Sequence, residues 1–248
     1  MKQNRNEQGF TLVELSIVLI IIGLIVGGVL AGQSLIRSAR LQNDITKFNQ
    51  IDASVNSFNV RYNGLPGDLS NATSFFTGTA QPTLVTNGNG NGIVASGTSG
   101  FVAAGAATEV SAAFDHLAAA GMVALGQYSE TAQASNAINV GILPSRTAGG
   151  IVLYGANSRN FVRFSVSSNA AADALLLTNL FTAEQVSFID NKLDDNNAIN
   201  GIVTSANATT LDTAGIVATD GTECNSAAGV YAVGITTANC AFRVRLSS

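Results

Sequence analysis

Residues 9–32 read GFTLVELSIVLIIIGLIVGGVLAG, and this stretch decides the fold of the amino-terminal part of the chain. From Ile17 to Gly32 it contains no charged or strongly polar side chain. Together with the preceding FTLVELS the run reaches about 23 residues, enough for a helix to cross a hydrocarbon core of about 30 Å. We therefore expect residues 10–32 to form a membrane-spanning helix.

A polar leader precedes the apolar run. Residues 1–9, MKQNRNEQG, carry Lys2, Arg5 and Glu7 and end in a small residue, Gly9. An ordinary secretory signal has its small-residue cleavage site after the apolar core, not before it. Cleavage at Gly9 would instead remove the polar leader and leave the apolar segment on the mature chain.

One carboxylate, Glu14, lies inside the apolar run. A charged side chain at the centre of a bilayer costs about 2.5–3.5 kcal/mol, and less near the end of a helix. The same segment offers no evident partner for this charge. Cleavage after Gly9 would create one, the new amino group of Phe10.

The sequence Gly9-Phe10-Thr11-Leu12-Val13-Glu14 resembles the prepilin peptidase recognition motif of type IV pilins and type II secretion pseudopilins. The resemblance implies cleavage between Gly9 and Phe10, methylation of the new amine, and a role for Glu14 in filament assembly. It implies three partners: prepilin peptidase, the bacterial inner membrane, and copies of the chain itself or related pilins. It also implies a single-pass protein with its head in the periplasm, and a cell-surface or periplasmic filament after assembly.

The helix is expected to continue beyond the membrane. Apolar residues recur at steps of three and four, which predicts an amphipathic helix over residues 33–63: Leu41, Ile45, Phe48, Ile51, Val55 and Phe58. Gly64 can take a left-handed cap, and Pro66 cannot continue the helix. The whole helix is then about 50 residues long, which matches the shape of a pilin.

Residues 64–248 are predicted to form a globular head of the α+β class. Strands are expected at residues 151–154 and 161–166, and helices at residues 109–120 and within 175–193. Thr182 and Gln185 fit a capping box. Residues 240–246 alternate as a closing strand, with Arg243 and Arg245 expected to face outward. This order fits a pilin head with a small antiparallel sheet.

For two features of the head, the Asn87–Gly92 repeat and His116, we expect no metal-binding or catalytic role. The repeat Asn87–Gly92, NGNGNG, has the spacing of a calcium loop, but its ligand positions are neutral and Thr98 stands where a bidentate Glu is needed. We therefore expect a flexible surface loop. The single histidine, His116, is expected to be a packing or surface residue.

Cys224 and Cys240 are the two cysteines of the chain. In an exported protein they predict one disulfide bond formed in an oxidising compartment. Two buried, unpaired thiols are the alternative.

An acidic cluster follows the capped helix, at Asp190, Asp194 and Asp195, with Asn197 as an additional oxygen donor. Carboxylates near a helix carboxyl end oppose the helix dipole. A bound calcium ion would relieve the repulsion, and it is the one cofactor we consider. The alternative is an exposed acidic turn neutralised by solvent and Lys192.

Composition argues against two other classes of protein. Charged residues make up 11% of the chain, the net charge is −4, and no long Lys/Arg stripe occurs, so no nucleic-acid partner is expected. With one histidine, two cysteines and no ligand-spaced motif, an enzyme is not expected either. The predicted function is a structural subunit of a type IV pilus or a type II secretion pseudopilus. A minor pilin acting as an adhesin or binding tip is the alternative.

Overall fold

The structure of the chain is a computed structural model. The residues described are 11–77, 85–94, 109–123, 143–144, 150–156, 158–167, 176–177, 181–207, 224–226, 228–235 and 240–247. The predicted cleavage residues Gly9 and Phe10 lie outside these ranges, as does Thr98. The chain divides into two compact units, Met1–Arg40 and Leu41–Ser248, and each is considered by itself.

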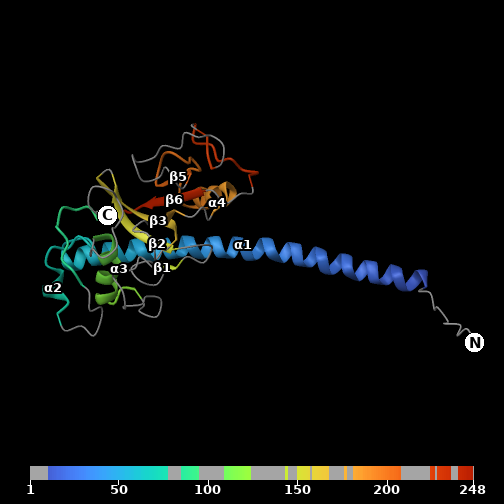
Figure 1. Ribbon diagram of the computed structural model, residues 1–248, viewed down its shortest axis with the longest axis horizontal. Coiled ribbons are helices and arrows are strands. Elements are labelled where there is room, and N and C mark those ends of the chain that lie inside the picture. The colour runs from blue at the N-terminus through green and yellow to red at the C-terminus, as the bar shows by residue number, and fades with distance from the viewer. Residues whose placement is uncertain are drawn as a thin grey trace, which may run out of the picture. The chain divides into compact units, whose positions relative to one another are not determined.

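Helix α1 runs from Leu12 to Tyr62, so one uninterrupted helix covers both predicted helical segments (Figure 1). In the first unit its large apolar side chains are exposed all round, from Leu12 to Ile36. Among the described residues, α1 is the one helix long and apolar enough to cross a membrane. Such a surface is stable only against lipid or against other apolar helices.

In the second unit α1 is amphipathic, as its spacing predicted. The buried residues include the full predicted stripe, with Val55 and Phe58 at 0% exposure. The helix ends differently from the prediction: Asn63, not Gly64, takes the left-handed conformation, with φ of 53°. Asparagine tolerates this region because its side chain can hydrogen-bond locally.

The head contains an antiparallel sheet. Six strands are found among the described residues: β1 Leu143–Pro144, β2 Gly150–Ala156, β3 Arg159–Ser167, β4 Leu176–Leu177, β5 Val203–Asn207 and β6 Cys240–Arg245. Their order is β1-β2-β3-β6-β5, with β4 paired to β3, and every pair is antiparallel. The carboxyl-terminal strand β6 therefore lies inside the sheet, between β3 and β5. The fold is α+β.

In the part of the chain that the structure describes, three further helices accompany the sheet: α2 Ala72–Phe75, α3 Glu109–Ala119 and α4 Ala183–Leu193. The predicted capping box of α4 is present, with Thr182 and Gln185 exchanging hydrogen bonds. The core forms where α1, α4 and one face of the sheet meet. There Phe48 of α1 lies near Phe164 and Phe242, whose rings stack at 4.8 Å.

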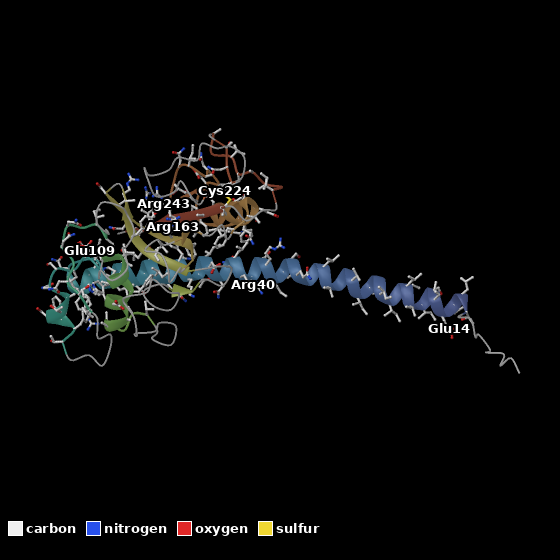
Figure 2. The ribbon with its side chains drawn as sticks, in the orientation of Figure 1. Glu14, Arg40, Glu109, Arg163, Cys224 and Arg243 are labelled. Atoms are coloured by element: carbon white, nitrogen blue, oxygen red, sulfur yellow. A yellow bond between two sulfur atoms is a disulfide. The ribbon has the colours of Figure 1, made fainter. Side chains whose placement is uncertain are left out.

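The helix expected within residues 175–193 is α4, and Leu176 and Leu177 before it pair with β3 as strand β4. One prediction for the sheet was wrong. Arg243 does not face outward: it is 1% exposed, and its cross-strand partner Arg163 is 0% exposed (Figure 2). The Arg243 guanidinium lies 4.2 Å from the ring centroid of Phe161 and donates hydrogen bonds to the hydroxyls of Thr204 and Tyr154.

These contacts explain how a central strand can bury arginine. Alternation predicts the face of the sheet on which a side chain lies, but not whether that face is shielded from water. Here the aromatic ring of Phe161 covers the cation, and two hydroxyls accept its hydrogen bonds, which offsets much of the cost of desolvation.

Candidate functional sites

Glu14 sits in the first turn of α1 and has a local partner that the sequence interpretation missed. The backbone N–H and the hydroxyl of Thr11 both donate to Glu14 Oε2, at 2.9 and 2.8 Å. The Glu14 N–H is 3.3 Å from the Thr11 hydroxyl. This is a capping box, and its T-x-x-E spacing was readable in the sequence. The expectation concerned a partner for the charge, and it overlooked Thr11 as a hydrogen-bond partner.

The capping box satisfies hydrogen bonds but does not neutralise charge. Both groups of Thr11 that reach Glu14 are uncharged donors. The carboxylate therefore keeps its negative charge at the amino end of an apolar helix, where the helix dipole favours it. Phe10, the predicted source of a cation, lies outside the described residues.

A second polar arrangement surrounds Asp68 in the head. Its carboxylate accepts hydrogen bonds from the backbone N–H groups of Gly90, Asn91 and Gly92, at 2.7 to 3.1 Å. Asp68 itself is 3% exposed. The predicted flexible loop is thus held at its centre by a buried anion. The backbone donors of this repeat hold a carboxylate.

His116 supports the same region from α3. Its Nδ1 accepts the Gly67 N–H at 2.9 Å, and Nε2 lies 2.9 Å from the Thr86 carbonyl oxygen. Gly67 has φ of +90°, and a side chain there would collide with the backbone of Glu109. Burial lowers the pKa of His116, while the bond to Thr86 raises it. The histidine is a packing residue, as one of the two expectations had it.

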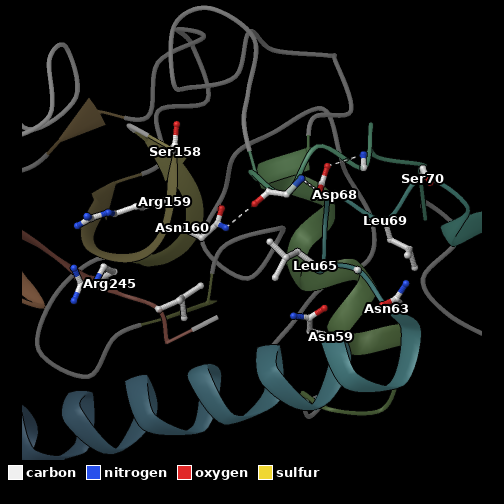
Figure 3. A pocket seen from close by; sticks show the side chains of 14 residues that line it. Asn59, Asn63, Leu65, Asp68, Leu69, Ser70, Ser158, Arg159, Asn160 and Arg245 are labelled. Atoms are coloured by element: carbon white, nitrogen blue, oxygen red, sulfur yellow. Dashed lines mark hydrogen bonds between the residues drawn. The ribbon is translucent and has the colours of Figure 1, made fainter.

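A polar cavity of about 700 Å³ opens beside this loop (Figure 3). Asp68 and Asn160 form part of its wall, and both are engaged with the loop backbone. Two cationic side chains also line it, the exposed Arg159 and the half-buried Arg245. Asn59, Asn63, Ser70 and Ser158 add amides and hydroxyls to the lining.

Cys224 and Cys240 are joined in a disulfide bond, with Cα atoms 5.2 Å apart. Both are buried. The bond ties β6 to the segment that contains Tyr231. The alternative of two unpaired thiols does not apply.

The structure brings the three predicted aspartates together. One carboxylate oxygen from each of Asp190, Asp194 and Asp195 lies within 4.8 Å of the other two. Asp190 is fully buried and accepts the Tyr231 hydroxyl at 2.7 Å. Asn197 uses its side-chain oxygen differently, as the acceptor for the Ile199 N–H.

Burial raises the pKa of Asp190 to about 6, and the charges of Asp194 and Asp195 act in the same direction. The Tyr231 hydroxyl and the backbone N–H of Asn196 oppose the shift. Burial also raises the pKa of Tyr231, so its hydroxyl remains a proton donor at neutral pH.

Residues 4–30 match the family model of the prokaryotic N-terminal methylation motif. That match spans the predicted cleavage residues and Glu14. Residues 4–30 thus carry the type IV pilin/pseudopilin signature. No match was found among curated proteins or among solved structures.

The match explains two amino-terminal features, the polar leader and the apolar first part of α1, by comparison with pilins. The motif implies processing by prepilin peptidase and assembly into a filament. The apolar first part of α1 fits a membrane-anchored protein. The motif ends well before the head, so the sites around Asp68, Asp190 and the polar cavity rest on the structure of this pilin-like chain alone.

Proposed function

We propose that this chain is a structural subunit of a type IV pilus or a type II secretion pseudopilus and assembles through the first part of α1. The observation that carries the proposal is a methylation motif in register with a helix whose large apolar side chains are all exposed from Leu12 to Ile36. Lipid covers that surface before assembly, and neighbouring helices of the same kind cover it in a filament.

Glu14 supplies the specificity of docking in this proposal. After cleavage, the Phe10 amine of a neighbouring subunit would meet a carboxylate that Thr11 already orients. The pair forms in an apolar setting, where opposite charges attract strongly and an unpaired charge is costly. Docking in any other axial register would leave both charges unpaired, so the pair would select one register.

Two substitutions separate charge from helix capping. Glu14→Ala removes both, whereas Glu14→Gln keeps an acceptor for Thr11 and removes only the charge. With each variant as the sole subunit, we expect membrane insertion to persist and filament yield to fall sharply for both. Ser16→Ala, which keeps the charge, the Thr11 contacts and the apolar surface, is the matched control and should assemble normally. Normal filaments from Glu14→Gln would contradict the charge-pairing role.

A binding tip is the second candidate function, and the polar cavity favours it. Arg159 and Arg245 place two guanidinium groups beside amides and hydroxyls, an arrangement suited to an anionic surface ligand. Quantitative mass spectrometry of sheared filaments distinguishes the two. A structural subunit is a dominant filament component, whereas a tip is present in trace amounts.

A further inference from the structure

We propose that Asn63 and Asn200 are sites of spontaneous deamidation, and that the fold protects the other Asn-Gly pairs of the chain from the same reaction. Five asparagines directly precede a glycine: Asn63, Asn87, Asn89, Asn91 and Asn200. All five pairs lie among the described residues. The inference concerns the covalent chemistry of the head and is independent of the filament role.

The reaction needs only an asparagine, the backbone nitrogen that follows it, and water. That nitrogen attacks the side-chain carbon Cγ, a C–N bond forms, and the side-chain nitrogen leaves as ammonia with the proton of the attacking N–H. Water then opens the resulting succinimide ring at one of its two carbonyl carbons, which gives aspartate or isoaspartate. Glycine favours the attack because it has no side chain beside the nitrogen and its backbone adopts the required conformation readily.

In the NGNGNG repeat each attacking N–H is already held by an acceptor. Gly88 donates to the Leu69 carbonyl oxygen at 2.9 Å. Gly90 and Gly92 donate to the two carboxylate oxygens of Asp68, at 2.8 and 2.7 Å. A nitrogen must give up its proton to attack, and negative charge that develops beside a carboxylate is unfavourable. Asp68 therefore protects two of the three pairs in the repeat.

The side-chain amides of the repeat are held as well. Asn87 Oδ1 accepts the N–H and the hydroxyl of Thr73, at 2.9 and 3.1 Å. Asn89 Oδ1 accepts the Asn91 N–H at 2.9 Å, and Asn91 Oδ1 accepts the Ile93 N–H at 2.8 Å. Ring closure at any of these asparagines requires the local hydrogen bonds to break first, so the repeat reacts only when it opens.

The pairs Asn63-Gly64 and Asn200-Gly201 lack these restraints. Among the described residues, neither the glycine N–H nor the asparagine side chain of either pair makes a hydrogen bond to another residue. Both asparagines are exposed, so water can reach the succinimide. These two pairs are therefore free to react in the folded head.

Deamidation at Asn63 changes the polar cavity. Asn63 lines this cavity together with Arg159 and Arg245 (Figure 3). The reaction replaces a neutral amide with a carboxylate, which adds negative charge to a wall whose cationic groups are the two arginines. Isoaspartate also adds one atom to the backbone directly after α1, where Asn63 has φ of 53°. The charge of the cavity therefore changes as the protein ages.

Peptide mapping by mass spectrometry tests the assignment on the detergent-solubilised full chain, incubated at mildly alkaline pH. We expect Asn63 and Asn200 to convert to aspartate and isoaspartate. Their rates should exceed those of the repeat by at least about tenfold, because the repeat must open locally before it reacts. The same chain in denaturant is the matched control, and all five pairs should then react at similar rates.

Asp68→Asn tests the protecting role of the carboxylate. This variant removes the anion beside the Gly90 and Gly92 N–H groups, so it should raise the rate of conversion at Asn89 and Asn91 in the folded chain. Unchanged rates at both asparagines in a folded variant would show that Asp68 does not protect them.

Gly64→Ala tests the reaction at Asn63 and stays informative if Asp68→Asn does not fold. The added methyl group meets only the end of the flexible Leu69 side chain, at 2.8 Å, and it hinders the attacking nitrogen. Conversion at Asn63 should slow, while conversion at Asn200 should not change. Equal rates at Asn63 and in the repeat of the folded chain would overturn the proposal. The same holds if Asn63 and Asn200 stay intact in the folded chain but react in denaturant.

Discussion

At the residue scale, His116 is held in one neutral tautomer. Nδ1 accepts the Gly67 N–H, so Nε2 carries the proton and donates it to the Thr86 carbonyl oxygen. A second proton on Nδ1 would point at the Gly67 N–H and break that hydrogen bond. Burial adds to this by lowering the pKa of the imidazole.

The lowered pKa of His116 predicts a pH-dependent stability. The unfolded chain takes up this proton more readily, so His116 contributes its full stability above the ordinary pKa of 6.5 and loses it as pH falls below that value. The free energy of unfolding should decrease by up to about 1.4 kcal/mol per pH unit in this window. Denaturant unfolding across the pH range measures it.

His116→Asn is the comparison variant, because its amide oxygen can still accept the Gly67 N–H but does not titrate. The pH profile of the variant is subtracted from that of the unaltered chain. This removes the contribution of Asp190, whose raised pKa makes the folded chain more stable as the pH falls. Parallel profiles for the two chains below pH 6.5 would show that His116 does not titrate on unfolding.

Some contacts of single residues could be predicted from the sequence, and others could not. The T-x-x-E pattern of Thr11 and Glu14 was available and was overlooked. By contrast, nothing near Asp68 predicts that its carboxylate binds backbone N–H groups more than twenty residues later in the chain. Such pairing depends on tertiary structure, as does the contact between Tyr231 and Asp190.

At the element scale, hydrophobic periodicity predicted the helices and central strands well. The apolar steps of α1 and α3 and the capping box of α4 are local properties, so they survive in the fold. Strand β4 is too short to have a period, so it was not predicted. Strand β6 lies between two neighbours, so alternation alone did not reveal that Arg243 is buried.

The amphipathic part of α1 offers a matched pair of substitutions. Val55 is 0% exposed and Val60 is 88% exposed, five positions apart on the same helix. Val55→Ala should destabilise the head by about 2 kcal/mol, because it removes buried methyl groups and leaves a cavity. Val60→Ala should change the free energy of unfolding by less than about 0.5 kcal/mol. Denaturant unfolding in detergent compares them, and equal losses would contradict the assignment of the buried face.

At the scale of the whole molecule, the chain consists of an apolar amino-terminal helix and an α+β head. The amino-terminal motif implies processing by prepilin peptidase and assembly into a filament. The head carries features that lie outside the motif: the disulfide and the polar cavity. Whether the chain works as a pilin-like subunit depends first on removal of the leader.

The most direct test of that claim is the intact mass of the chain isolated from cell membranes. The account predicts a mature chain that begins at Phe10 and carries one additional methyl group on its amine. A Gly9→Ile variant, with a bulky residue at the cleavage position, should retain the full leader and begin at Met1. An unaltered chain that still begins at Met1 in membranes containing an active prepilin peptidase would contradict the account.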